Sequence, residues 1–327
     1  MRYVVIGAGA IGGAVGGRLH QHGHSAVLVA RGPHFEALSR DGLRLEDPDG
    51  EVTLDVPVVD DPAAVDWNGD DVALLATKTH QTPAALEQLT AVAPPDVPVL
   101  CLQNGVANER MALRRFPNVH GVVVMLPAAH LVPGAVVVST TGITGILDLG
   151  RAPDGVDDVD ERVAADLSSA SFSSQPAADV MAWKRAKLLL NLGNAVEAAC
   201  VDSDSEAAKV LADRARAEGE ASFTAADWTW TDAAAFAARR KGILAPWRPA
   251  DGTTRPGGST FQSLLRRKGS TEVDYLNGEI VLLGRLHGVA TPTNELLQAT
   301  IRRMAQNETA PGSLHAQELL DAVDGHP

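Results

Sequence analysis

The chain has 327 residues, of which 45% are hydrophobic and 21% are charged, and its formal net charge at pH 7 is −13. This length favours about two domains with a large buried core. The negative charge argues against nucleic acid and anionic membranes as partners, and no apolar run approaches the roughly 20 residues of a membrane-spanning helix.

The first half of the chain alternates short apolar strands with helical segments. Strands are expected at 2–6, 25–30, 70–77 and 97–103, and helices at 11–23 and 82–93. This alternation predicts a parallel sheet with right-handed crossovers. Asp49 and Gly50 stand between two alternating runs and predict a β-hairpin over 43–57, while segment 119–150 is expected to add antiparallel strands.

Helical patterns dominate the second half of the chain. They cover 181–201, 205–218, 231–240, 259–288 and 293–306. A loop rich in proline and glycine is expected at 245–258, and the tail is expected to form a loop and a short helix. The prediction is therefore an α/β protein with an N-terminal Rossmann-type, doubly wound sheet in domain 1–179 and an all-helical C-terminal domain, 180–327, for substrate binding and dimerisation.

A glycine-rich loop joins the first strand to the first helix. The segment "GAGAIGG" gives Gly7, Gly9 and Gly12 the G-x-G-x-x-G spacing of dinucleotide-binding loops. Gly7 permits a tight turn, Gly9 lets the backbone approach a pyrophosphate, and Gly12 allows close packing of helix and strand. The residues expected to bind the cofactor here are Gly7, Ala8, Gly9, Ala10, Ile11 and Gly12.

The end of the second strand indicates which dinucleotide binds. NAD-binding sites usually have an acidic residue there that accepts hydrogen bonds from the ribose 2′-hydroxyl. This chain reads "LVARG", with Arg31 and no acid. A guanidinium matches a 2′-phosphate in charge and geometry, so NADPH is the expected cofactor.

No metal site and no disulfide framework are expected. His20, His22 and His24 cluster at a predicted helix end without acidic or cysteine ligands, where histidines suit the negative end of the helix dipole. The two cysteines, Cys101 and Cys200, build no disulfide scaffold, which favours a reducing cytoplasm.

Polar side chains interrupt several apolar segments. Lys187, Asn191 and Asn194 have the spacing of one face of a helix. Lys78 and Asn104 follow two neighbouring strands, at the edge where open parallel sheets bind ligands.

Glu272 shares a predicted helical face with Leu276 and Leu283, so it is expected to point inward. A buried carboxylate is unfavourable without a partner, and Lys187 is the expected one.

These motifs together resemble the ketopantoate reductases (2-dehydropantoate 2-reductases) over nearly the whole chain. The matching pieces are "GAGAIG", "AR" after the second strand, "TK" at 77–78, "QNG" at 103–105, "KLLLN" at 187–191, "ST…TE" at 259–272 and "GVATPTN" at 288–294. The resemblance implies a Rossmann domain followed by a helical domain, and NADPH-dependent reduction of a 2-keto acid, most simply 2-dehydropantoate in pantothenate biosynthesis.

The resemblance also implies roles for single residues. Lys187 takes the place of the general acid and Glu272 that of the residue that orients it. Lys78 and Asn104 fall on cofactor-binding positions. The substrate-binding positions are Asn104, Asn191, Asn194 and Thr260.

Three alternatives stay open. Asn194 follows Asn191 by three residues where the family usually has four, and Thr260 stands where serine is common. These departures leave room for another 2-keto acid or a secondary-metabolite ketone as substrate. The second alternative is a β-hydroxyacid or opine-type dehydrogenase, and the third is a non-catalytic NADP-binding sensor.

A homodimer built on the helical domain is compatible with the sequence but not required by it.

Overall fold

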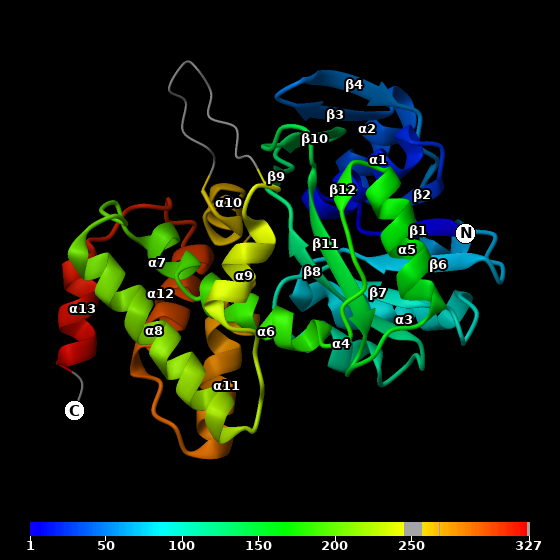
Figure 1. Ribbon diagram of the computed structural model, residues 1–327. Coiled ribbons are helices and arrows are strands. Elements are labelled where there is room, and N and C mark those ends of the chain that lie inside the picture. Colours follow the sequence, from blue (N-terminus) through cyan, green and yellow to red (C-terminus); the bar gives the residue numbers. More distant parts are fainter. Residues whose placement is uncertain (245–256, 268, 326–327) are drawn as a thin grey trace. The chain divides into compact units, whose positions relative to one another are not determined.

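An eight-stranded sheet forms the centre of the first of two structural units in the computed structural model (Figure 1), which describes residues 1–244, 257–267 and 269–325. Its order is β12-β11-β8-β7-β6-β1-β2-β5. The strands are β1 (Arg2–Ile6), β2 (Ser25–Val29), β5 (Val58–Val59), β6 (Asp71–Leu75), β7 (Val99–Cys101), β8 (Val119–Met125), β11 (Gly145–Arg151) and β12 (Phe172–Ser173).

The order of the sheet identifies its class. From β5 to β8 it follows the 3-2-1-4-5-6 order of doubly wound dinucleotide-binding sheets, and all of these neighbours pair in parallel. β11 pairs antiparallel with β8, as expected for the segment after 119. The predicted α/β fold and its Rossmann-type sheet are confirmed.

A second, four-stranded sheet lies beside helix α1 (Ala10–Gln21). Its order is β4 (Gly50–Leu54), β3 (Leu43–Asp47), β10 (Ala135–Val138) and β9 (Ala128–Ala129). The predicted hairpin is confirmed, with Asp47 opposite Gly50. Its pairing with β10 was not predicted, because it joins segments about 90 residues apart in the chain.

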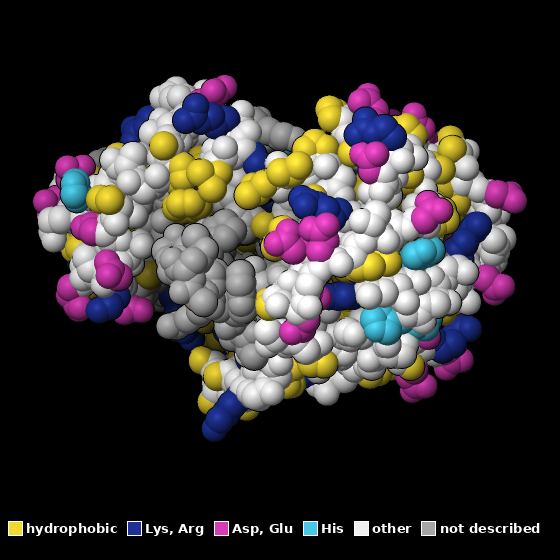
Figure 2. Space-filling view, turned by 90° about the horizontal axis from the view of Figure 1, so that it is seen from above, with side chains coloured by type: hydrophobic (Ala, Val, Ile, Leu, Met, Phe, Trp, Pro, Cys, Tyr) yellow, Lys and Arg dark blue, Asp and Glu magenta, His cyan; other side chains and the backbone are white. Residues whose placement is uncertain are grey.

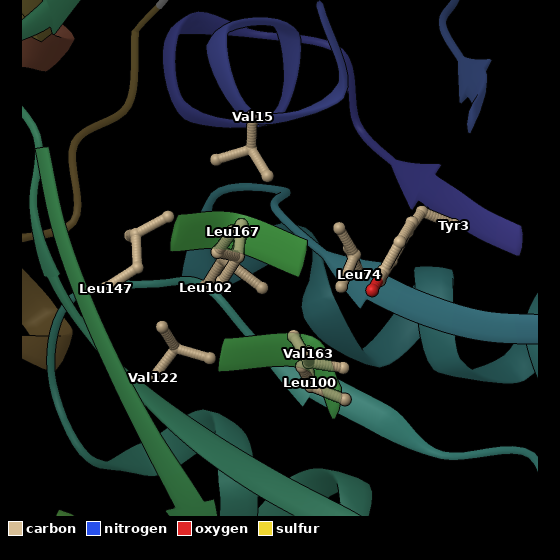
Figure 3. Close-up of a pocket in the computed structure, with 9 residues that line it drawn as sticks. All are labelled: Tyr3, Val15, Leu74, Leu100, Leu102, Val122, Leu147, Val163 and Leu167. Carbon is tan, nitrogen blue, oxygen red and sulfur yellow. The ribbon is translucent and has the colours of Figure 1, made fainter. Parts of the chain in front are cut away.

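Four further helices precede α6 (Val180–Asn191) in the first unit: α2 (Gly32–Asp41), α3 (Thr82–Val92), α4 (Ala107–Ala112) and α5 (Asp158–Ser169). Figure 3 shows apolar side chains from α1, α5 and the sheet converging on a cavity of about 10 Å³. It is lined by Tyr3, Val15, Leu74, Leu100, Leu102, Val122, Leu147, Val163 and Leu167. A space this small and apolar is a packing defect of the core rather than a ligand site.

Helix α9 (Ala233–Arg240) also belongs to the first unit, although it follows α8 (Glu206–Ala225) of the second unit in the chain. Its Arg239 donates two hydrogen bonds to the carboxylate of Asp148 on β11, at 2.7 and 2.6 Å. Phe236 of the same helix packs against the ring of Trp183. A bidentate pair of this kind fixes orientation as well as position.

The second unit is helical. Its helices are the end of α6 (Val180–Asn191), then α7 (Asn194–Ala199), α8, α10 (Ser259–Leu265), α11 (Asn277–His287), α12 (Pro292–Gln306) and α13 (Ala316–Asp324). The two units meet in the chain inside α6, between Lys184 and Arg185. The domain boundary between 179 and 180 stays a prediction.

Three of the predicted helices are wrong in extent. The helix expected over 205–218 extends to Ala225. The helix expected over 181–201 ends at Asn191, and α7 begins at Asn194. The helix expected over 259–288 is divided into α10, a 3₁₀ turn at Val273–Tyr275 (η3) and α11. Most of the loop predicted at 245–258 lies outside the described residues.

On the face that Figure 2 shows, positively charged Lys and Arg side chains are interspersed with negatively charged Asp and Glu side chains. Within the part of the chain that the structure describes, no helix is both long enough and apolar enough to cross a membrane.

Both cysteine thiols are buried and unpaired. Burial, reinforced by the nearby charge of Glu109, raises the pKa of Cys101 well above its ordinary value, and burial raises the pKa of Cys200 to about 11. Both groups are therefore protonated and shielded at pH 8, and the thiolate, which is the reactive form, is scarce.

We expect a disulfide reagent to react slowly with the native protein and rapidly with two thiols per chain in guanidinium. Rapid labelling of the native protein would contradict this.

Candidate functional site

The loop between β1 and α1 has the geometry of a dinucleotide-binding turn. Gly7 has a φ of +102°, a conformation that residues with a side chain rarely adopt. The backbone N–H groups of Gly7 and Ala8 donate to the carbonyl of Val29, which ties the loop to the end of β2. Helix α1 starts at Ala10 without a side-chain cap and without an acidic residue in its first turn, so its N-terminus suits an anion.

Gly9 and Gly12 differ in what surrounds them. A Cβ atom on Gly12 would lie 2.1 Å from the carbonyl oxygen of Gly7 and 2.8 Å from Val5, so this position is closed by the protein itself. A Cβ atom on Gly9 would meet nothing within 4 Å. The open side of the loop is therefore at Gly9, next to the helix N-terminus. Ala8 is buried, and Ala10 and Ile11 are partly exposed.

Arg31 lies directly after β2 and is exposed at the start of α2. Its guanidinium donates to the side-chain oxygen of Gln88 on α3. The residue is at the strand end where a ribose 2′ substituent is recognised in doubly wound sheets.

Lys78 and Asn104 lie on two neighbouring loops of the same sheet edge, after β6 and β7. Both side chains are partly buried, and both have interactions with their surroundings. Asn108 joins the two loops, because its side-chain nitrogen donates to the hydroxyl of Thr79 and to the carbonyl of Asn104, each at 3.3 Å. The structure thus brings these two predicted residues together within the first unit.

Lys187 and Asn191 lie one turn apart on α6, within the second unit, and both are partly buried. The side-chain nitrogen of Asn191 is buried, and no described residue accepts a hydrogen bond from it. A buried amide donor without a partner is unfavourable, so it is available for a ligand.

Asn194 and Thr260 are brought together by two other helices of the second unit. Asn194 begins α7, and Thr260 is buried near the start of α10. The carboxylate of Glu197 on α7 accepts the backbone N–H of Gly258, at 3.2 and 3.1 Å, and this bond holds the two helix ends side by side. The predicted row of Lys187, Asn191 and Asn194 on one helix is wrong, because the helix breaks before Asn194.

Glu272 is buried, as expected, but it precedes η3 instead of lying on a helix with Leu276. Burial lowers the pKa of Arg266, and the negative charge of Glu272 opposes that shift, so the two charges are close. Glu272 and Lys187 each have interactions with their surroundings.

Two buried polar networks escaped sequence reasoning. Lys184 forms an ion pair with Glu109 at 2.8 Å, and both side chains are almost completely buried. In the second unit, the carboxylate of Glu218 accepts the N–H groups of Thr293 and Asn294 at the start of α12. The only sequence signal for these networks is a lysine or an asparagine inside an apolar segment. The partner of each residue is distant in the sequence, so the pattern does not reveal it.

His120, Asp157 and Asp160 are the one group of side chains close enough to hold a metal ion among the described residues. Most of their atoms already have partners, since Asp160 pairs with Nδ1 of His120 at 2.7 Å and Asp157 caps α5, while Nε2 of His120 has no hydrogen-bond partner among the described residues. Burial alone would raise the pKa of Asp157, but Arg151 at 2.6 Å and backbone N–H groups hold it below its ordinary value. This arrangement is a capped helix end with compensated charges.

Comparison with known proteins decides the family. The model of "Ketopantoate reductase PanE/ApbA" matches residues 3–153, and the model of its C-terminal part matches 179–305. A 2-dehydropantoate 2-reductase of Caulobacter vibrioides is 30% identical over 92% of this chain and 98% of its own. The chain belongs to the ketopantoate reductase PanE/ApbA family. A 2-dehydropantoate 2-reductase of Pyrococcus horikoshii is 27% identical over 92% of this chain and 97% of its own.

Solved structures agree with this assignment. A PanE/ApbA family ketopantoate reductase from Ralstonia eutropha JMP134 superposes with a TM-score of 0.77 at 28% identity, over 94% of this chain and 99% of the other. A D-mandelate dehydrogenase with NADH and anilino(oxo)acetate gives a TM-score of 0.80 at 23% identity over 95% and 100%, and it supports the fold alone. Members of the ketopantoate reductase family are oxidoreductases that use a nicotinamide cofactor.

The contrast between Gly9 and Gly12 gives a matched pair of variants. Gly12→Ala forces a Cβ atom onto a backbone carbonyl and should destabilise the protein by about 1–3 kcal/mol. Gly9→Ala fits without contact and should leave the melting temperature unchanged, while it weakens dinucleotide binding about 10-fold or more, since the methyl group occupies the space of the pyrophosphate. Calorimetry and cofactor titration measure the two effects. Equal binding by wild type and Gly9→Ala would disprove this assignment of the loop.

Proposed function

We propose that the protein reduces a 2-keto acid to a 2-hydroxy acid with NADPH, and that 2-dehydropantoate is the substrate, with pantoate as product. The observation that carries the proposal is the match of the family model to both parts of the chain, joined to a dinucleotide loop that is open at Gly9. The curated relatives named 2-dehydropantoate 2-reductase support the choice of substrate.

Lys187 is proposed as the general acid. When a ketone is reduced, the nicotinamide supplies hydride to the carbonyl carbon and negative charge develops on the oxygen. An ammonium group stabilises that charge and then donates its proton. Glu272, buried in the same unit, is proposed to orient the lysine and to accept a hydrogen bond from the product hydroxyl.

Neutral donors are proposed to hold the substrate. Asn191 has a buried side-chain nitrogen without an acceptor among the described residues, which suits a keto acid oxygen. Asn194 and Thr260 lie at adjoining helix ends, and Asn104 lies beside Lys78 at the sheet edge. Amides and hydroxyls bind a carboxylate or a hydroxyl without adding charge.

Another 2-keto acid is the second candidate substrate. The observation that favours it is the helix break at residues 192–193, which places Asn194 on α7 rather than on α6. The test is the loss of NADPH absorbance with 2-dehydropantoate and with a panel of branched and aromatic 2-keto acids. Turnover of another keto acid but not of 2-dehydropantoate would transfer the function to that substrate. Binding of NADPH without any turnover would favour the non-catalytic sensor.

Replacement of the acid tests the mechanism. Lys187→Ala should lower kcat about 100- to 10,000-fold, the usual contribution of a positioned general acid, with little change in the dissociation constant of NADPH. Lys209→Ala, which removes an exposed lysine of the same unit, is the matched control and should keep full activity. Full activity of Lys187→Ala would remove this lysine from the mechanism.

Replacement of Arg31 tests the cofactor. A hydrogen-bonded guanidinium contributes about 1.5–3 kcal/mol to binding of a charged group. Arg31→Ala should therefore raise the KM for NADPH about 10- to 100-fold and leave the KM for NADH unchanged. Steady-state kinetics with both cofactors measure the ratio, and an equal rise for both would assign Arg31 to some other part of the dinucleotide.

The reducing cytoplasm is the proposed compartment, in agreement with two buried and unpaired cysteines. A homodimer built on the second unit stays a prediction, which light scattering would decide.

A further inference from the structure

A buried ammonium group at the start of α6 has no role in the function proposed above. Lys184 is 3% exposed. Its Nζ donates to the carbonyl of Gln103 at 2.8 Å and to the carbonyl of Val122 at 3.1 Å, and it contacts the carboxylate of Glu109 at 2.8 Å. Nζ also donates to the carbonyl of Cys101 at 3.5 Å, so its three hydrogens meet three carbonyl acceptors, and Glu109 supplies the opposite charge.

Stability alone does not account for this Lys184–Glu109 pair. The two side chains are 2% and 1% exposed, so both charges have lost their hydration. Apart from the ion pair, neither carboxylate oxygen of Glu109 accepts a hydrogen bond from any described residue. Apolar residues of similar volume often stabilise a fold as well as a buried ion pair does, or better. A role in placing particular atoms is therefore the better explanation.

The Lys184–Glu109 pair contacts the chain on both sides of Asn104. Gln103, whose carbonyl accepts from Lys184, is the residue before Asn104. Glu109 lies on α4, one residue after Asn108, which donates to the carbonyl of Asn104. The loop that carries Asn104 is thus held on both sides, at Gln103 and at α4.

The same network continues to the loop that carries Lys78. The side chain of Gln103 donates to the hydroxyl of Thr82 at 3.2 Å, and that hydroxyl donates to Asn108 at 2.8 Å. Asn108 in turn donates to Thr79, the residue after Lys78. A single buried chain of hydrogen bonds therefore connects Lys184 to both loops of the sheet edge.

We propose that Lys184 and Glu109 are positioning residues for the reduction: they hold the loop of Asn104, and through Gln103 and Thr82 the loop of Lys78, in the arrangement that the keto acid and cofactor require. The proposal rests on the proposed function of Asn104 and Lys78. Lys184 also lies on α6, three residues before Lys187 in the sequence.

The first test removes both charges at once. Lys184→Met alone would leave Glu109 buried and unpaired, whereas the double variant K184M/E109L replaces the pair by apolar side chains of similar size. We expect this variant to keep a melting temperature near that of the wild type. Amide hydrogen exchange in the segment 102–110 should become about 10-fold faster, since the loop has lost its anchor. Unchanged exchange in a folded double variant would overturn the proposal.

The second test asks whether the pair acts through Asn104. The double variant should lower kcat/KM for the keto acid about 10-fold and should also raise the KM for NADPH, because the loops of Asn104 and Lys78 both lose their anchor. Asn104→Ala should then have a much smaller effect in the K184M/E109L background than in the wild type, because coupled residues are not additive. Equal effects of Asn104→Ala in both backgrounds would show that the pair acts elsewhere, and would overturn the proposal.

Two further variants make every outcome informative. If K184M/E109L does not fold, Thr82→Val takes its place, because it removes only the hydroxyl in the middle of the network. Amide hydrogen exchange in 102–110 should then become faster and kcat/KM for the keto acid should fall, each by less than expected for the double variant. A folded Thr82→Val with unchanged exchange and kinetics would then overturn the proposal. Thr300→Val is the control, because this buried threonine lies on α12 outside the network and its hydroxyl has no hydrogen-bond partner among the described residues.

The hydrogen-exchange measurement separates this inference from the proposed function. If the wild type reduces no keto acid, the proposed function fails, and exchange in 102–110 still decides whether the pair anchors the loop. If the wild type is active and the double variant retains both its exchange rates and its kcat/KM, the function stands and the inference fails.

Discussion

The close packing of α1 against two sheets is the constraint on which the first unit depends. The segment "GGAVGG" places Gly12 and Gly16 on one side of the helix and Gly13 and Gly17 on the adjacent side. Cβ atoms on the first pair would lie within 2.8 Å of β-sheet residues or the loop, and Cβ atoms on the second pair would lie 2.8 Å from Val136 and 2.7 Å from Leu43 of the smaller sheet. Glycine lowers intrinsic helix stability by about 1 kcal/mol per residue relative to alanine. Packing therefore stabilises α1, and the same packing brings its uncapped N-terminus to the end of β1, where the dinucleotide loop lies.

Charges inside this acidic chain act as fixed connections between segments that are far apart in the sequence. Arg239 joins α9 to Asp148 on β11, Lys184 joins α6 to Glu109, and Glu218 joins α8 to the start of α12. Arg239, Lys184 and Glu218 each meet two or more hydrogen-bonding groups, which offsets their loss of hydration. Such pairs contribute more to geometry than to stability, because an apolar replacement would fill the same space without specifying the same orientation. The regular strands and helices build the two units, and these buried charges define how single loops and helix ends lie within each unit.

How much could be predicted from the sequence depended on the distance over which a signal acts. The strand β1, the loop of Gly7, Gly9 and Gly12 and the hairpin at Asp49 were predictable, because each pattern lies within a few residues and has one physical interpretation. The pairing of β3 with β10 was not predictable, nor was the attachment of α9 to the first unit, because their partners are distant in the chain. Lys184 escaped notice for the same reason, since a lysine on a helix usually extends to solvent, and only the fold shows that Glu109 meets it.

The helix break between Asn191 and Asn194 explains why the identity of the substrate was harder to infer from the sequence than the type of reaction. Gly193 has φ and ψ angles of −67° and −15°, close to helical values, so α6 ends without the left-handed glycine that commonly closes a helix. The break divides the polar residues of the second unit into two sets. Lys187 and Asn191 stay together on α6, whereas Asn194 joins Thr260 through the bond between Glu197 and Gly258. The first set carries the chemistry proposed for any 2-keto acid, a proton donor and a neutral donor one helical turn apart. The second set depends on the contact between α7 and α10, where this chain departs from the usual family spacing, and the choice among keto acids is expected to reside there.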